Sequence, residues 1–255
     1  NMTHDECVSQ SDTNVASVSE LKTGNFQSKR QKPVDGDLLA KRWHIDRRKA
    51  RNTVKATTQR GIRTCLHPSL SRRFPTNDRM LRYDRLPHNV FSDTMFAGVK
   101  SKSGNKCAQV YCTQYGWSRF YPMKSKGEAH ESLSLMFKKD GVPPQMCVDG
   151  SKEQRQGRFA AKCREADCHL IATEPYSPWM NAAEGCVKHV KQGSSRKMLI
   201  SGSPRRVWDH CGEYEALVRS HTALDIYGLH GHVPETVMKG QTVDISFIAE
   251  FEWFH

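Results

Sequence analysis

The sequence of 255 residues predicts an α/β fold in which helices flank a mixed five-stranded sheet. Two observations predict it. Residues 88–123 contain three strand patterns separated by Gly and Ser residues. From residue 127 onward, amphipathic helix patterns alternate with two short strand patterns. Strands joined by short turns, followed by strands separated by helices, are typical of a mixed sheet with helices packed on it.

The N-terminal part is polar at first and then becomes helical. Residues 1–36 lack apolar periodicity and are expected to be disordered. Residues 37–62 hold two short helical patterns. Leu39 and Trp43 share one face of the first helix, and Asp46 can cap the second.

The second of these helices is strongly basic. Its cationic residues are Arg47, Arg48, Lys49, Arg51 and Lys55. A helix, a tight break and a second basic helix are typical of a helix-turn-helix DNA-binding segment. A basic helical hairpin without such a role has the same pattern, so both interpretations stay open here. Residues 63–87 are expected to be an Arg-rich linker, with prolines at 68, 75 and 87.

The net charge of +12 is concentrated in one segment. Residues 29–88 hold 17 Lys and Arg against 5 Asp, and the rest of the chain holds equal numbers of basic and acidic residues. A surplus confined to one segment favours binding to a polyanion, most simply nucleic acid. A solvated basic linker is the alternative.

The core is predicted to span residues 88–226. Strands are expected at 89–99, 105–116, 118–125, 142–150 and 169–175, and helices at 127–141, 157–168, from 177 onward and at 204–224. The resulting order βββαβαβαα is that of the ribonuclease H-like fold. Residues 227–255 follow this core, and their aromatic end "FEWFH" suggests a fragment of a longer polypeptide.

The nine cysteines include no C-x-x-C pair, so a cysteine-based zinc module is not expected. Most of them lie in apolar runs, where a thiol behaves as a small hydrophobic group, which favours a reducing compartment. There is no run of about 18 apolar residues, and no secretory signal pattern opens the chain. We therefore expect no membrane partner.

Two aspartates lie in predicted strands. Strand alternation places Asp93 on one face together with Phe91 and Met95. A charge among such neighbours is unfavourable unless it is paired or bound to metal, although an edge strand could expose it to water. Asp149 ends the strand "QMCV" and precedes Gly150, which is also an ordinary turn pattern.

A third carboxylate, Glu184, lies early in a predicted helix that Ser177 can cap and Pro178 can begin. The buried stripe of this helix is expected to contain Trp179, Ala183, Cys186, Val187 and Val190. A polar stripe beside it contains Asn181, Glu184, Lys188 and Lys191. A solvated Glu–Lys pair would explain Glu184 alone.

The predicted topology brings Asp93, Asp149 and Glu184 to one edge of the sheet. Three such charges repel one another, and divalent metal would neutralise them. Oxygen ligands suit Mg²⁺ or Mn²⁺. We expect two ions, with Asp93 bridging both, Asp149 binding one and Glu184 the other. Two ions about 3.5–4 Å apart would stabilise the attacking and leaving oxygens of a phosphoryl transfer.

These residues resemble the integrase of copia-type long-terminal-repeat retrotransposons, within the wider group of retroviral integrases and DDE transposases. Asp149 and Glu184 lie 35 positions apart, one short of the usual family spacing. The stretches "CVDGSKEQRQGRFAAKCREADCHLIATEPYSPWMNAAEG" and "SRFYPMKSKGEA" are similar to the family's segments. Residues 227–255 contain "VPETVMKGQTVDISFIAEF", which looks like the copia-type segment beyond the core. The similarity covers roughly residues 86–251.

The resemblance implies metal-dependent DNA strand transfer by a multimer on element ends and target DNA, in the nucleus or in a cytoplasmic particle on the way to it. It places Asp93, Asp149 and Glu184 at metal-ligand positions, and Lys188 and Lys191 at DNA contacts. Two other functions stay open: a catalytically idle DNA-binding remnant of a retroelement, and a ribonuclease H-like nuclease.

Overall fold

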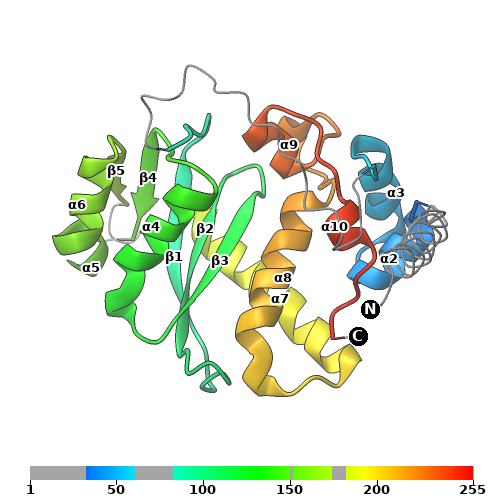
Figure 1. Ribbon diagram of the computed structural model, residues 1–255, viewed down its shortest axis with the longest axis horizontal. Helices are drawn as coiled ribbons and strands as arrows, with labels where there is room; N and C mark the ends of the chain where they lie inside the picture. The colour runs from blue at the N-terminus through cyan, green and yellow to red at the C-terminus, as the bar shows by residue number, and fades with distance from the viewer. Residues whose placement is uncertain (1–32, 61–82, 150–151, 174–181, 255) are drawn as a thin grey trace, which may run out of the picture. The chain divides into compact units, whose positions relative to one another are not determined.

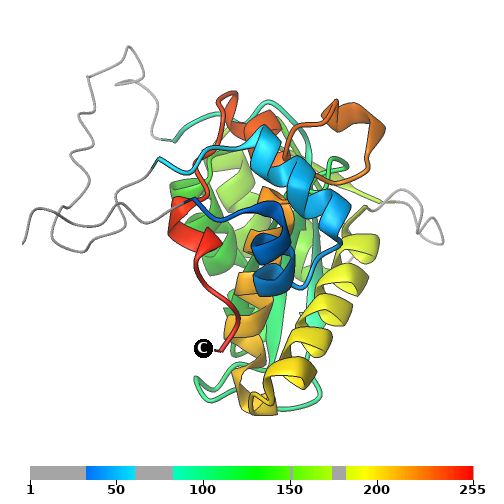
Figure 2. The same cartoon turned by 90° about the vertical axis from the view of Figure 1, so that its right-hand side faces the viewer.

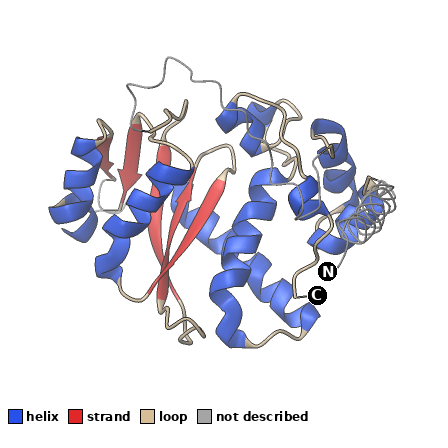
Figure 3. Ribbon diagram, in the orientation of Figure 1, coloured by secondary structure: helices blue, strands red, loops and turns tan. Residues whose placement is uncertain are grey.

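A five-stranded mixed sheet forms the centre of the computed structural model (Figures 1 and 3). Its strands are β1 (Val90–Phe96), β2 (Cys107–Cys112), β3 (Ser118–Met123), β4 (Gln145–Val148) and β5 (His169–Ala172). They lie in the order β3-β2-β1-β4-β5. β2 is antiparallel to both of its neighbours, whereas β1, β4 and β5 are parallel. The predicted ribonuclease H-like α/β fold is confirmed.

The structure describes residues 33–60, 83–149, 152–173 and 182–254. The described residues from Val34 onward belong to one compact unit. Most of the segment predicted to be disordered and most of the predicted linker lie outside the described residues. The helix cap Ser177, Pro178, and the stripe residues Trp179 and Asn181 also lie outside them.

Helices cover both faces of the sheet (Figure 1). On one face, α4 (Ala129–Lys139) and α6 (Gly157–Glu165) bury Leu133, Met136 and Phe159 against strand residues. The other face is covered by two longer helices, α7 (Ala182–Ser201) and α8 (Trp208–His221). Short elements complete this part: 3-10 turns at Lys126–Glu128, Arg205–Val207 and Tyr227–Leu229, and helix α5 at Lys152–Arg155.

Helix α7 packs closely along α8, and Figure 2 shows the two side by side. The predicted stripe residues Ala183, Cys186, Val187 and Val190 are all buried against the sheet. Further along α7, Lys197 is 3% exposed and pairs with Glu215 of α8 at 2.5 Å. A Cβ atom at Gly193 would overlap the Glu215 side chain, so a larger residue here would displace the carboxylate that pairs with Lys197.

The basic N-terminal segment forms two helices, α2 (Gly36–Trp43) and α3 (Arg47–Ala56). Asp46 caps α3 by accepting hydrogen bonds from the amides of Arg48 and Lys49, as predicted. The break between the helices lies at His44, which has a φ of 53°. The two predicted helices and the tight break between them are thus present, and the role of this segment in DNA binding stays a prediction.

These two helices pack in a hydrophobic cluster together with α8 and the C-terminal part of the chain, so they do not form a separate body. Leu39, Trp43 and Ala50 pack with Val218 of α8 and with Ile248 of α10 (Ser246–Ala249). The indole nitrogen of Trp43 donates to the Ile248 carbonyl at 3.2 Å. The basic segment is therefore held by the C-terminal part of the chain.

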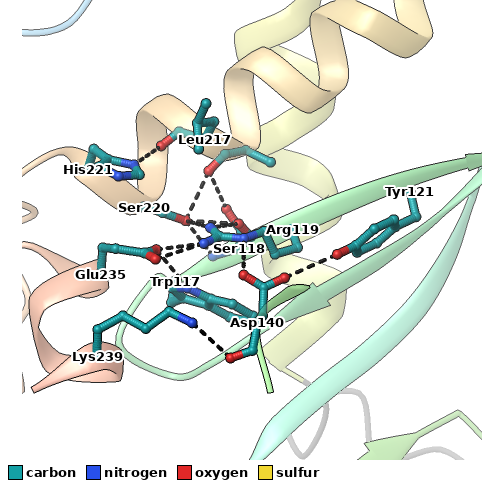
Figure 4. Close-up of polar contacts among 11 residues, drawn as sticks. Trp117, Ser118, Arg119, Tyr121, Asp140, Leu217, Ser220, His221, Glu235 and Lys239 are labelled. Atoms are coloured by element: carbon teal, nitrogen blue, oxygen red, sulfur yellow. Dashed lines mark hydrogen bonds and ion pairs between the residues drawn. The ribbon is translucent and has the colours of Figure 1, made fainter. Parts of the chain in front are cut away.

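A buried ionic network attaches the C-terminal segment to the sheet (Figure 4). Arg119 of β3 donates to both carboxylate oxygens of Glu235 at 2.8 Å and to Asp140 at 2.8 Å. Glu235 lies in α9 (Pro234–Lys239) and also accepts from the Trp117 indole at 2.9 Å. Residues 227–255 are thus joined to the core by charge as well as by packing.

The seven described cysteines are all free thiols, and every one except Cys147 is buried. Cys7 and Cys65 lie outside the described residues. None of the helices in the described ranges combines the length and apolarity that a membrane crossing requires.

Candidate active site

Asp93 lies in the middle of β1, the central strand of the sheet. Its neighbours Phe91 and Met95 on the same face pack in the cluster beneath α7, as the strand alternation predicted. Asp93 is half-buried, and its Oδ1 accepts a hydrogen bond from the Thr94 amide at 2.6 Å. The carboxylate therefore lies on the face of the sheet that α7 covers.

Asp149 comes directly after β4, which runs parallel to β1. The strand register pairs Ser92 with Val148, so the next residue along each strand is an aspartate. In neighbouring parallel strands, residues that are paired in register lie side by side at the same end of the sheet. The topology thus explains why two carboxylates 56 positions apart in sequence come close together.

Glu184 lies in the first turn of α7 and is exposed. Its neighbour Ala183 is fully buried in the cluster that contains Met95 and Val110. This packing fixes the start of α7 against β1 and β2, beside the strand position that carries Asp93. The third predicted carboxylate is therefore on the same side of the sheet as the first.

The electrostatics show that the three carboxylates interact. Burial is the main cause that raises the pKa of Asp93 above its ordinary value. The negative charges of Asp149 and Glu184 raise this pKa further, while the Thr94 amide and the Lys126 ammonium lower it. Asp149 and Glu184 are therefore near enough to Asp93 for their charges to act on it.

The donor chemistry of this neighbourhood fits a hard divalent cation, because carboxylate oxygens are the ligands that Mg²⁺ and Mn²⁺ prefer. Asp93, Asp149 and Glu184 all lie within the described ranges, however, and in those ranges no three acidic, His or Cys side chains are close enough together to hold an ion. The chain on the C-terminal side of Asp149 and on the N-terminal side of Glu184 is outside those ranges. The assignment of the three acids as metal ligands stays a prediction.

The raised pKa of Asp93 predicts that Asp93→Asn stabilises the metal-free protein at neutral pH. The folded state holds the Asp93 proton more tightly than the unfolded chain does. This residue therefore contributes stability below its ordinary pKa of 3.8, and the contribution is lost as pH rises through the raised value. We expect the Tm of the variant in a chelator to exceed that of the native protein by a few degrees at neutral pH.

The matched control for this stability measurement is Asp167→Asn. The Asp167 side chain is 98% exposed, and asparagine tolerates its φ of 54°. The Tm advantage of Asp93→Asn should disappear below the ordinary pKa, whereas Asp167→Asn should match the native protein throughout. A constant Tm difference for Asp93→Asn across the whole pH range would show that the raised pKa of Asp93 is not its cause.

Sequence reasoning missed two features of the sheet, one at the site and one on the opposite face, which α4 and α6 cover. Lys126, in the 3-10 turn after β3, is the cation that acts on Asp93. The other is a row of buried amides and hydroxyls beneath β1: Gln109 donates to Ser92 at 2.6 Å and accepts from Thr94 at 2.9 Å. The sequence does contain a sign of this row: Gln109 lies in the middle of the apolar run "CAQVYC", and a buried glutamine needs hydrogen-bond partners.

The two lysines predicted to contact DNA are exposed on α7. Lys188 and Lys191 follow Glu184 by four and seven positions, which places all three along one stripe of the helix. This stripe begins at the candidate carboxylate site. The arrangement gives an anionic polymer a cationic surface next to the three acids.

The five cations of α3 differ in how they are held. Arg48 pairs with Asp225 at 3.3 Å, and Arg51 pairs with Asp37 at 3.1 Å. Lys49 lies 4.0 Å from Asp225. Two of the predicted DNA contacts, Arg47 and Lys55, are exposed and have no ion-pair partner in the part of the chain that the structure describes.

Neither protein-family models nor curated protein sequences gave a match. Among solved structures, the chain is similar to a chain of the simian T-cell lymphotropic virus intasome in complex with PP2A regulatory subunit B56 gamma. The TM-score is 0.50 at 17% identity, over 62% of this chain and 56% of that chain. The similarity thus spans only about half the length of that chain.

Two isolated catalytic cores were also found. The HTLV-2 integrase core in complex with magnesium has a TM-score of 0.45 at 14% identity, over 59% of this chain and 95% of that chain. The BIV integrase core has a TM-score of 0.43 at 15% identity, over 59% and 93%. At such identities a likeness concerns the fold. The protein has the ribonuclease H-like fold that retroviral integrase cores share.

Proposed function

We propose that this protein is a retroelement integrase that catalyses metal-dependent DNA strand transfer with Asp93, Asp149 and Glu184. One observation carries the proposal. The charges of Asp149 and Glu184 both act on the half-buried Asp93, although the three residues come from two strands and a helix. In a ribonuclease H-like sheet, such convergence favours a polynucleotidyl transferase over a purely structural role.

The residues would divide the chemistry of strand transfer between them. A DNA 3′-hydroxyl attacks a target phosphodiester, one P–O bond forms, and the P–O bond to the target strand's leaving 3′-oxygen breaks. A pair of divalent ions, when bound, stabilises the attacking and leaving oxygens. Asp93, Asp149 and Glu184 would hold those ions, and Lys188 and Lys191 would bind phosphates beside them.

The finer assignment is a copia-type retrotransposon integrase that acts as a multimer on DNA in the nucleus. This assignment rests on sequence segments that resemble those of the copia-type family in the same order, including residues 227–255. The Arg119–Glu235 network supports treating this segment as part of the working enzyme, because it fixes α9 to β3. Partners would be the element ends and the target DNA.

The direct assay is strand transfer between labelled oligonucleotides with Mn²⁺ or Mg²⁺. The proposal expects joined products only when metal is present, and little cleavage of an RNA–DNA hybrid. Cleavage of the hybrid without joining would instead identify a nuclease. DNA binding without either reaction would identify the idle remnant, which is favoured by the absence of a three-ligand group within the described ranges.

The basic helix α3 should contribute to DNA affinity through cations that are free to reach phosphates. Because Trp43 and Ala50 are core residues, substitutions test this better than deletion. Arg47→Gln with Lys55→Gln should lower the slope of log affinity against log salt by about 2, since each phosphate contact contributes about 0.9. Fluorescence anisotropy with a DNA duplex at several salt concentrations measures the slope.

The matched control is Arg48→Gln with Arg51→Gln, which removes the same charge from the same helix. Those two guanidinium groups already pair with Asp225 and Asp37, so the slope should change less. An unchanged slope in the Arg47 and Lys55 variant would refute a role for α3 in DNA binding.

A further inference from the structure

Helix α7 carries an exposed histidine, His189, in its second turn, directly after Lys188. Arg196 lies two turns further along the same face of this helix. The Arg196 guanidinium donates to the His44 carbonyl at 2.6 Å. Because that carbonyl belongs to the break before α3, the face of α7 that carries His189 is turned toward the start of α3.

Helix α8 brings an arginine to the same place. Only residues 202–207 separate α7 from α8, and the two helices run antiparallel (Figure 2). Gly193 of α7 faces the Glu215 side chain of α8, so these two positions are level with each other. One turn back along α7 is His189, and one turn forward along α8 is Arg219. Arg219 therefore lies beside His189.

Helix α3 crosses the end of α8 and adds a lysine. Lys49 lies in the first turn of α3, and its ammonium is 4.0 Å from Asp225 in the loop after α8. In the same loop, the amide of Ala223 donates to the Thr53 hydroxyl of α3 at 2.8 Å. We call the place where the three helices meet the helix junction. It contains Lys49, Lys188, His189 and Arg219.

The helix junction holds more positive charge than its acids balance. Asp225 pairs with two cations of α3. In the described ranges, Lys188, His189 and Arg219 have no carboxylate within ion-pair distance. The negative end of α8 favours one cation, Arg219, but it does not explain the groups that come from α3 and α7. Like charges that meet from three helices favour a bound anion.

We propose that the helix junction binds a phosphate diester of the DNA backbone through Lys49, His189 and Arg219. This inference rests on the proposed function and extends its DNA contacts to α8. His189 follows Glu184 by five residues, about 7.5 Å along the helix axis, so the junction adjoins the carboxylate site. A DNA strand that reaches the three acids passes Lys188 and then meets the junction. Helices α3 and α7 thus form one DNA-binding surface.

Binding of DNA should transfer a proton to His189. In the free protein, burial lowers the pKa of His189 below its ordinary value of 6.5. The positive charges of Arg219, Lys188 and Lys49 lower this pKa further. A phosphate beside the imidazole favours the charged form and raises the pKa again. DNA affinity should therefore rise as the pH falls through the pKa of the bound state, with one proton taken up.

The test is calorimetric titration of the full chain with a DNA duplex, in buffers of different ionisation enthalpy. The dependence of the heat on the buffer gives the number of protons taken up. Compared with the native protein, His189→Gln should take up fewer protons and should bind about tenfold more weakly at pH 5.5, where a charged contact is lost. At pH 8, where the imidazole is neutral, its affinity should be close to native.

Two controls make the titration specific. His210→Gln removes an exposed histidine near the start of α8, at the far end from Arg219, and should keep the native proton uptake. Inorganic phosphate at the same phosphate concentration should cause much less proton uptake than the duplex does. Equal uptake with inorganic phosphate would identify a site for a free anion and would overturn the assignment to DNA.

Arg219→Gln should lower the slope of log affinity against log salt by about 0.9, the contribution of one phosphate contact. Arg205→Gln removes the same charge from the far end of the α7–α8 pair and should leave the slope unchanged. A Tm measurement shows that each variant is folded. If the native protein binds DNA, and folded His189→Gln and Arg219→Gln show its pH and salt dependence, this inference is wrong while the proposed function stands. Absence of DNA binding by the native protein would overturn both.

Discussion

Asp93→Asn should abolish metal-dependent strand transfer while leaving DNA binding intact. The substitution keeps the shape of the side chain and removes the one charge that both other acids act on. Bound metal ions stabilise the charge of the transition state by several kcal/mol. If the variant loses the ions that Asp93 holds, the rate should fall by about 10³-fold or more. The measurement is the yield of joined oligonucleotides with Mn²⁺, alongside DNA affinity by anisotropy.

Asp167→Asn serves as the control, because it removes an equivalent charge from an exposed position. It should retain native strand transfer. If the native protein joins DNA and Asp93→Asn joins it equally well, the three carboxylates are not the catalytic group. A parallel loss of DNA binding in Asp93→Asn would point to a misfolded variant, which its Tm would reveal.

Arg119→Met should destabilise the fold by about 3–5 kcal/mol, the usual cost of leaving partner charges buried and unpaired. Arg119, whose side chain is 16% exposed, lies between the buried carboxylates of Asp140 and Glu235, and its guanidinium also lies 4.6 Å from the centre of the Trp117 ring (Figure 4). Methionine fills a similar volume but leaves Asp140 and Glu235 without their cation. Urea denaturation followed by circular dichroism measures the change in the free energy of unfolding.

Two comparison variants make this experiment specific. Lys162→Met breaks the exposed pair with Glu165 and should cost well under about 1 kcal/mol. Adding Glu235→Gln to Arg119→Met should recover part of the loss, since one unpaired charge disappears. If Arg119→Met cost no more than Lys162→Met, the network would not be what joins the C-terminal segment to the sheet.

The sheet and its helices could be predicted because each leaves a local pattern in the sequence. The alternation of Phe91, Asp93 and Met95 marked one face of β1, and the spacing of Ala183, Val187 and Val190 marked the buried side of α7. Such patterns depend on a residue and its near neighbours. The cap at Asp46 was recognisable for the same reason.

Features that depend on distant partners could not be predicted in this way. Arg119 and Glu235 are 116 positions apart, and nothing near either residue indicates that they pair in the interior. Likewise, the packing of Trp43 against Ile248 makes the basic helices part of the main body, although their composition looked like that of a separate segment. Topology decides such contacts.

The central claim is that Asp93, Asp149 and Glu184 together bind divalent metal. Titration of Mn²⁺ followed by electron paramagnetic resonance tests it most directly, because it needs neither DNA nor turnover. The account predicts saturable binding to the native protein and to Asp167→Asn, and strongly weakened binding to Asp93→Asn and Asp149→Asn. Equal Mn²⁺ binding by the native protein and Asp93→Asn, or no saturable binding at all, would contradict it.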